Sequence, residues 1–134
     1  MDQDALLRDK RILIIEDVPE NLRLFRAILQ LEDAVVLEAE RAVLGIELAR
    51  GEQPDLILMD MQMPEMDGLT ATKILRADPQ TRDIPIVIIT ASAMRDDRQR
   101  AFDAGCNGYI TKPVDPMSLV RQLVAFLPDT PASS

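Results

Sequence analysis

The sequence predicts an α/β fold in which a parallel β-sheet is built from successive βαβ units. Short apolar segments rich in β-branched residues alternate with stretches in which apolar residues recur at helical spacing, and this alternation is typical of parallel sheets. The chain has 134 residues and is 47% hydrophobic, which suits one domain with a sizeable core of its own.

Five segments are predicted as strands, and they lie at residues 11–16, 34–39, 55–60, 85–90 and 107–111. The first, third and fourth are continuous apolar runs, as expected of central strands that helices cover on both faces. The second and fifth are weaker, which indicates positions nearer the edges of the sheet.

Two helices are indicated by apolar residues whose spacing places one stripe toward the core. The stripe after the first strand is Leu22, Phe25, Ile28 and Leu29, and the stripe near the C-terminal end is Val120, Leu123, Val124 and Leu127. Pro19 and Pro116 stand where these helices can begin. Gly51 and Gly105 stand where a left-handed residue commonly ends a helix.

The helical segment at residues 93–105 differs from the others because it offers few apolar side chains. Only Met94, Ala101, Phe102 and Ala104 are available to pack inward. The segment is therefore either an ordinary surface helix or a weakly anchored helix that can shift.

Composition excludes several classes of function. The net charge of -8 repels phosphate backbones and anionic membranes, so a protein partner is favoured over nucleic acid. The absence of histidine rules out Ser-His-Asp and Cys-His nucleophiles and histidine-bound metals. Cys106 is the only cysteine, which excludes an internal disulfide and fits a small, semi-buried hydrophobe.

The location of the protein follows from what the chain lacks. No apolar run approaches the roughly 20 residues that span a bilayer, and the first residues are acidic where a signal peptide would be basic. The expectation is a soluble, cytoplasmic protein without membrane contact.

Polar side chains follow four of the predicted strands at the point where each strand ends. In an open parallel sheet, ligands bind at this edge. Each residue has an ordinary explanation when taken alone, such as a helix cap for Asp17, but their conjunction predicts a site. The polar residues are Glu16, Asp17, Asp60, Thr90, Ser92, Thr111 and Lys112, and Pro113 directly follows Lys112.

The residue types at these strand ends suit phosphoryl transfer. If the first and third strands are neighbours, Asp17 and Asp60 converge, and like charges that close either raise a pKa or recruit a cation. Magnesium prefers oxygen ligands, and a few carboxylates leave room in its shell for a phosphate oxygen. Lys112 supplies a positive point charge on the other side. Asp60, held at a strand end, is then a positioned nucleophile.

Four segments of the sequence resemble the receiver domain of two-component response regulators. They are IIEDVPEN, LILMDMQMPEMDG, PIVIITASA and CNGYITKP, and they occur in the family's order and at its usual separations. The resemblance implies a doubly wound, flavodoxin-like (βα)5 sheet with strand order 2-1-3-4-5. It covers residues 11–127, with 1–10 as an N-terminal extension and 128–134 as a disordered tail or the start of a linker. A stand-alone receiver of the chemotaxis or cell-cycle type and a receiver excised from a hybrid histidine kinase both remain open.

The resemblance also implies a role for each residue of the site. Asp60 would be the phosphoacceptor, and Glu16, Asp17, Asp60 and the backbone carbonyl of Gln62 would bind Mg²⁺. Lys112 would contact the phosphoryl group. Thr90 would move toward that group, and Tyr109 would turn inward behind it.

Further implications concern tuning and partners. Gln62 and Ser92 stand at the two positions that tune the lifetime of the aspartyl phosphate, and the bond preceding Pro113 is usually cis in relatives. The phosphoryl donor would be a sensor histidine kinase or a histidine phosphotransfer protein. The output would pass to a downstream protein through the fourth helix, fifth strand and fifth helix. A homodimer formed on phosphorylation remains open.

Three alternative functions compete with a phosphoacceptor. An aspartyl-phosphate hydrolase usually carries a second aspartate where this chain has Gln62. A nucleotide- or flavin-binding module would need a glycine-rich loop after the first strand, where this chain has EDVPEN. A docking module that works without phosphorylation is the third alternative.

Overall fold

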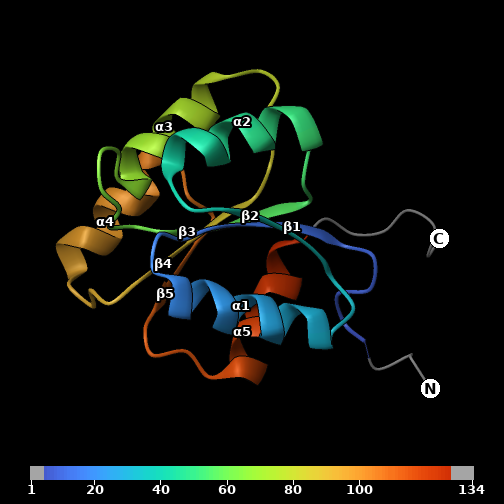
Figure 1. The fold of residues 1–134 in the computed structure, drawn as a ribbon. Coiled ribbons are helices and arrows are strands. Elements are labelled where there is room, and N and C mark those ends of the chain that lie inside the picture. Colours follow the sequence, from blue (N-terminus) through green and yellow to red (C-terminus); the bar gives the residue numbers. More distant parts are fainter. Residues whose placement is uncertain (1–4, 128–134) are drawn as a thin grey trace.

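A computed structural model describes residues 5–127 of the chain and shows a parallel sheet of five strands in the order β2-β1-β3-β4-β5 (Figure 1). The strands are β1 (Arg11–Ile15), β2 (Val35–Ala39), β3 (Leu56–Asp60), β4 (Ile86–Thr90) and β5 (Gly108–Thr111). The helices are α1 (Pro19–Leu31), α2 (Ala42–Glu52), α3 (Gly68–Ala77), α4 (Arg95–Ala104) and α5 (Pro116–Phe126). The predicted fold class and strand order are confirmed, and β2 and β5 lie at the edges.

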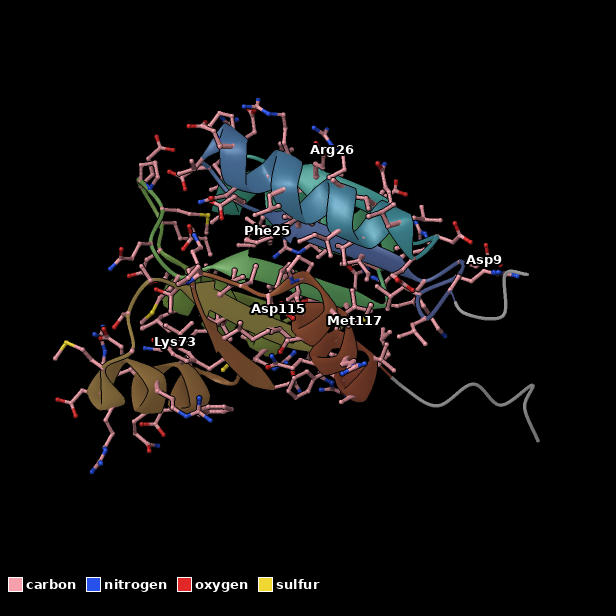
Figure 2. The ribbon with its side chains drawn as sticks, turned by 90° about the horizontal axis from the view of Figure 1, so that it is seen from below. Asp9, Phe25, Arg26, Lys73, Asp115 and Met117 are labelled. Atoms are coloured by element: carbon pink, nitrogen blue, oxygen red, sulfur yellow. The ribbon has the colours of Figure 1, made fainter. Side chains whose placement is uncertain are left out.

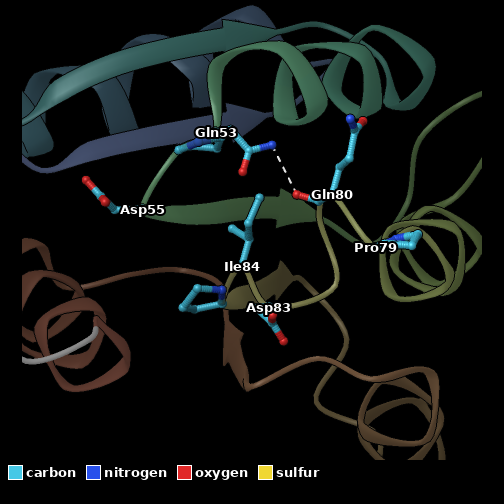
Figure 3. A pocket seen from close by; sticks show the side chains of 8 residues that line it. Gln53, Asp55, Pro79, Gln80, Asp83 and Ile84 are labelled. Atoms are coloured by element: carbon cyan, nitrogen blue, oxygen red, sulfur yellow. Dashed lines mark hydrogen bonds between the residues drawn. The ribbon is translucent and has the colours of Figure 1, made fainter.

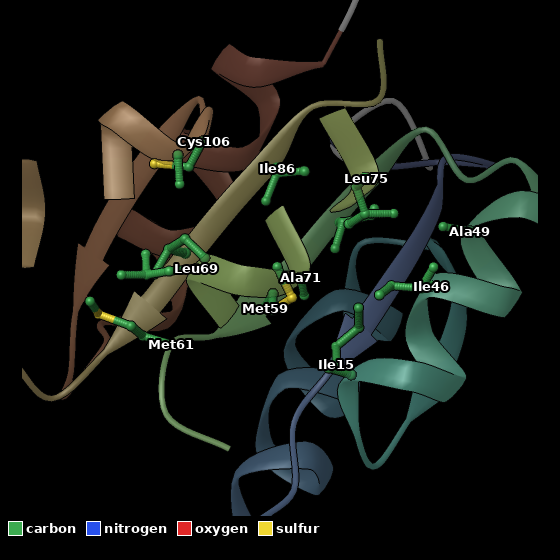
Figure 4. Packing of buried hydrophobic residues seen from close by; sticks show 14 of the residues in the cluster. Ile15, Ile46, Ala49, Met59, Met61, Leu69, Ala71, Leu75, Ile86 and Cys106 are labelled. Carbon is green, nitrogen blue, oxygen red and sulfur yellow. The ribbon is translucent and has the colours of Figure 1, made fainter. Parts of the chain in front are cut away.

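The helices form one layer on each face of the sheet. Helices α1 and α5 cover one face, and α2, α3 and α4 cover the other (Figure 1). Phe25 of α1 lies between its helix and the strands (Figure 2). On the opposite face Ile46 and Leu75, from α2 and α3, pack against Met59 of β3 (Figure 4). Because both faces are covered, β3 and β4 are buried at every position, as their apolar sequences require.

The register of the strands brings their carboxyl ends to one edge. Ile15 pairs with Met59, and Asp60 pairs with Ile89 of β4. Thr90 in turn pairs with Thr111 of β5. The helices that follow β1 and β3 lie on opposite faces (Figure 1), and in open parallel sheets ligands bind at the ends of two such strands.

The helix starts agree with the sequence, but one predicted helix end is wrong. Pro19 and Pro116 open α1 and α5, and Gly105 ends α4 with a φ of 114°. Gly51, in contrast, lies inside α2, and the left-handed residue after this helix is Gln53, with a φ of 50°. Pro54 follows Gln53 and disfavours a helical conformation for it, so the proline determines where α2 ends.

A hollow of about 300 Å³ lies beside this helix end, at the edge opposite to the polar strand ends (Figure 3). The side chain of Gln53 crosses its rim and donates a hydrogen bond of 3.0 Å to the backbone oxygen of Gln80. Asp55 and Asp83 also line it. This hollow is remote from the predicted site.

Two predicted apolar stripes are partly wrong. In α5, Val124 is 37% exposed, and Leu119 is buried in its place beside Val120 and Leu123. Of the four residues proposed to anchor α4, Ala101 and Ala104 are buried, while Met94 and Phe102 are 67% and 37% exposed. Helix α4 therefore meets the rest of the protein through small side chains, and its large apolar residues lie toward solvent.

The described residues contain no helix with both the length and the apolar character that crossing a membrane requires. The proposed tail at 128–134 lies outside the described residues, as does the start of the proposed extension at 1–10. Leu7, from the described part of that extension, is fully buried against the cluster beneath α1 and α5.

Candidate functional site

Three carboxylates meet at the carboxyl edge of the sheet. Glu16 and Asp17 directly follow β1, and Asp60 is the last residue of β3. One oxygen from each lies within 4.8 Å of the others. Glu16 and Asp60 are only 1% and 5% exposed. Three acids so close together, two of them almost fully buried, are costly unless cations compensate their charge.

Backbone groups hold two of these carboxylates in place. The Gln62 N–H donates to Asp60 Oδ1 at 3.1 Å, and the Val18 N–H donates to Glu16 Oε2 at 3.1 Å. The backbone of Asp60 is fixed by Gly68, the first residue of α3. A Cβ on Gly68 would lie 2.5 Å from the Asp60 backbone oxygen, so only glycine allows this close approach.

Lys112 supplies the positive charge that the sequence predicted at this edge. Its Nζ lies 3.3 Å from Asp60 Oδ2 and 3.4 Å from Glu16 Oε1. One ammonium facing three carboxylates leaves the cluster negative when all the carboxyl groups are ionised. The peptide bond between Lys112 and Pro113 is cis.

Asp17 is the carboxylate whose bonding is incomplete. Its Oδ1 is buried and has no hydrogen-bond partner among residues 5–127. Asp17 does not cap α1, because the N-cap position is Val18 and no side chain bonds the helix start. A buried acceptor without a partner costs free energy, and a divalent cation would satisfy it. The donor set, oxygen only and negatively charged, fits Mg²⁺.

The crowding changes the protonation of Glu16. The pKa of Glu16 is raised to about 7, chiefly by burial and also by the hydrogen bond and the negative charge of Asp60. The Val18 N–H and Lys112 act in the opposite direction. Near pH 7 and without metal, the Glu16 carboxyl group is therefore protonated in a large fraction of the molecules.

This shift predicts a pH-dependent effect of Glu16→Gln on stability. The ordinary pKa is 4.5 and the folded one is about 7, so the folded state binds the proton more tightly than the unfolded state. Ionising Glu16 does not lower the stability of the folded state below the ordinary pKa of the group. Its full cost to stability is reached above the folded pKa. As the pH rises between these limits in metal-free protein, the free energy of unfolding of Glu16→Gln should increase by up to about 3 kcal/mol relative to that of wild type.

Urea unfolding in EDTA at about pH 5 and about pH 8 measures this gain. Glu20→Gln, which changes an exposed carboxylate in the first turn of α1, is the control and should show no such trend. A difference between Glu16→Gln and wild type that stays constant with pH would contradict the assignment.

A chain of hydrogen bonds runs from Thr90 at the end of β4 to helix α4. Thr90 is 1% exposed, and its Oγ1 accepts from the Ser92 N–H at 3.2 Å. The Ser92 hydroxyl donates to Asp97 Oδ2 at 2.5 Å. The Tyr109 hydroxyl donates to the Ser92 backbone oxygen at 2.8 Å. Ser92 thus joins Thr90, Tyr109 and α4.

The predicted site residues therefore form two groups, one around the carboxylates and one along the hydrogen-bonded chain of Thr90, Ser92 and Tyr109. The carboxylates, Lys112 and the backbone N–H of Gln62 surround one point, whereas the side chain of Gln62 is exposed. The hydroxyl of Ser92 is engaged by α4. Sequence reasoning missed Asp97 and Arg98, which contact Ser92 and Tyr109. For Arg98 a signal existed, because its spacing from Phe102 places both on one face of α4.

The family model of the response regulator receiver domain matches residues 12–124 of the chain. The chain belongs to this family. This receiver is 37% identical over 120 residues to the polar-differentiation response regulator DivK of Brucella anthropi, which covers 90% of this chain and 98% of that protein. DivK of Brucella melitensis is equally similar.

Solved receiver structures share the fold. The receiver domain of a sensor histidine kinase from Pseudomonas aeruginosa has a TM-score of 0.83 at 33% identity, and the likeness covers 88% of this chain and 97% of that one. That structure holds a magnesium ion in its active-site cleft. Chemotaxis protein CheY4 of Vibrio cholerae, at 24% identity, has a TM-score of 0.85 and covers 89% of this receiver and 99% of its own chain. The protein is thus a receiver of two-component signalling.

Proposed function

We propose that this receiver accepts a phosphoryl group on Asp60 from a phosphohistidine of a partner protein, in a reaction that requires Mg²⁺. The observation that carries the proposal is the placement of the Asp60 carboxylate. It lies at the end of a buried strand, 3.3 Å from the Lys112 ammonium and within reach of Glu16 and Asp17. The donor would be a sensor histidine kinase or a histidine phosphotransfer protein, because this chain contains no histidine of its own.

The metal would be held by the carboxylates of Glu16, Asp17 and Asp60 and by the backbone carbonyl of Gln62. The unpartnered Oδ1 of Asp17 supports this assignment. When bound, Mg²⁺ supplies positive charge that offsets the charge on the transferring phosphoryl oxygens.

The protein's own groups account for the transfer. A carboxylate oxygen of Asp60 attacks phosphorus as the bond from phosphorus to the donor's histidine nitrogen breaks, and that nitrogen keeps the electron pair. The Gln62 N–H and Lys112 hold the two oxygens of Asp60 in fixed directions, which lowers the entropic cost of the attack. Lys112 stabilises negative charge on the phosphoryl group.

The phosphorylated side chain would then act on the hydrogen-bonded chain at Thr90. The Thr90 hydroxyl accepts from Ser92 and retains its own proton to donate to a phosphoryl oxygen. Movement of Thr90 would carry Ser92 with it, and Tyr109 is bonded to Ser92. The result is a shift in the population of conformations of the α4–β5–α5 face, where a downstream protein would bind.

Incubation with acetyl phosphate and magnesium, followed by intact-mass measurement, tests the proposal. Acetyl phosphate replaces the unidentified phosphohistidine as donor. The expected result is an adduct of one phosphoryl group per chain that forms with magnesium and not in EDTA. Failure to form an adduct under conditions in which the protein is folded would refute the proposal.

Replacing Lys112 with alanine should separate phosphorylation from switching. The nucleophile and the metal ligands remain, so Lys112→Ala should still form the adduct. The conformational response should weaken because the phosphoryl group loses a cation that helps to position it. Amide resonances of α4 and β5 measure this response when beryllium trifluoride and magnesium are added.

The Lys112→Ala shifts should be smaller than those of wild type, and Thr90→Ala should act likewise. Lys73→Ala, which removes an exposed lysine of α3, is the matched control and should respond as wild type does. A full response in Lys112→Ala would show that Lys112 has no part in the switch.

A further inference from the structure

Tyr109 of β5 is buried beneath a cation from helix α4. The ring is 8% exposed in this receiver. The guanidinium carbon of Arg98 lies over the ring, 5.7 Å from its centroid. At the far end of the side chain, the hydroxyl bonds to the Ser92 backbone oxygen at 2.8 Å. One contact fixes the hydroxyl and the other covers the ring.

Arg98 makes its contacts with aromatic faces. The same guanidinium lies 5.1 Å from the centroid of Phe102, one turn further along α4. In the described part of the chain it forms no ion pair, and a cation at these distances is attracted by the electrons of a ring face. Arg98 therefore bridges the exposed side of α4 to the aromatic ring of β5.

This bridge matters because α4 has few other anchors. Its buried residues are Ala101 and Ala104, whose small side chains contribute little apolar burial. The contact of Arg98 with Tyr109 and the bond from Ser92 to Asp97 are side-chain contacts that join α4 to the loop after β4 and to β5.

We propose that Arg98 is a positioning residue that holds Tyr109 in its buried place and so favours the signalling conformation of this receiver before phosphorylation. The first part follows from the contacts of Arg98, Tyr109 and Ser92. The second part rests on the proposed function and on the family resemblance, which implies that Tyr109 turns inward when the receiver is phosphorylated. Arg98 acts through Tyr109 and does not itself reach the carboxylates of the site.

The size of the effect follows from the exposure of the contact. Arg98 is largely solvent-exposed, and exposed cation–π contacts correspond to a shift of about two- to fivefold in an equilibrium constant. Because coupling between two equilibria is reciprocal, loss of Arg98 should weaken the binding of a phosphoryl analogue by up to the same factor.

The intrinsic fluorescence of the protein reports on Tyr109 directly, because the chain has one tyrosine and no tryptophan. Acrylamide quenching would be measured on metal-free, unphosphorylated wild type and on Arg98→Gln, Arg98→Lys and Arg95→Ala. Glutamine keeps much of the length of the side chain and its cover over the ring, but it removes the charge. Lysine restores the charge. Arg95→Ala removes another exposed arginine of α4.

Arg98→Gln should raise the quenching constant, Arg98→Lys should return it toward wild type, and Arg95→Ala should leave it unchanged. Equal quenching in wild type and Arg98→Gln would overturn the proposal. So would an equal rise in Arg95→Ala, because the cause would then be a general loosening of α4.

Titration with beryllium trifluoride in the presence of magnesium tests the second part. Arg98→Gln should bind about two- to fivefold more weakly than wild type, and unchanged affinity would overturn the bias toward the signalling conformation. If wild type itself fails to bind the analogue, the proposed phosphoryl site fails, and the quenching result still decides whether Arg98 positions Tyr109.

Discussion

Asp60→Asn should abolish the proposed phosphorylation of this receiver. The amide has nearly the shape of the carboxylate, so the fold and the hydrogen bond from the Gln62 N–H at Oδ1 should survive. The uncharged amide oxygen is a far weaker nucleophile, and no other carboxylate in the cluster is placed at the end of β3 between Lys112 and Gln62. Incubation with acetyl phosphate and magnesium should therefore leave the mass of the variant unchanged.

The matched control is Asp67→Asn. Asp67 is an exposed carboxylate that caps α3 by accepting from the Thr70 N–H at 2.8 Å, and asparagine caps a helix about as well as aspartate. This variant should form the adduct as wild type does. An adduct that persists in Asp60→Asn would place the phosphoacceptor elsewhere and refute the central assignment.

Asp17→Asn should weaken the proposed magnesium binding by at least about tenfold. Loss of groups that merely orient metal ligands already costs about ten- to a hundredfold in affinity, and Asp17 would be a ligand itself. Its unpartnered Oδ1 would lose the negative charge that attracts the cation, while asparagine keeps the size of the side chain. Calorimetric titration with magnesium measures the affinity directly.

Glu20→Gln serves as the control for Asp17→Asn because it removes one negative charge three residues further along the chain, from an exposed position. Magnesium affinity in this variant should stay close to that of wild type. Equal affinity in wild type and Asp17→Asn would show that Asp17 is not part of the metal site.

The strand ends could be located from the sequence because their physics is local. Continuous apolar runs identify β1, β3 and β4, and parallel strands bring their carboxyl ends to one edge. Asp60 follows such a run directly, so its place at that edge needed only the strand assignment. The distances among Glu16, Asp17 and Asp60 depend on β1 pairing with β3, which the alternation of elements alone does not determine.

One error arose where tertiary contacts choose between local alternatives, and another arose from a proline that was not weighed. In α5, Leu119, Val120, Leu123 and Val124 allow two overlapping stripes, and packing selected the one that includes Leu119 and exposes Val124. At the end of α2, the proline after Gln53 decided the boundary in place of Gly51.

The contacts of α4 with the loop after β4 and with β5 were beyond local reasoning. Asp97 meets Ser92, and Arg98 meets Tyr109, only because α4 lies beside the loop after β4 and beside β5. The sequence showed that few apolar residues anchor this helix, but it could not show that charged residues would provide its specific contacts.

Chemical mapping of the phosphorylated residue tests the central claim most directly. Borohydride reduces an aspartyl phosphate to homoserine, so reduction after incubation with acetyl phosphate and magnesium, followed by peptide sequencing in a mass spectrometer, identifies the acceptor. The account predicts homoserine at position 60 and at no other aspartate. Homoserine at Asp17, or unmodified aspartate at position 60 in a chain that carries the adduct, would contradict it.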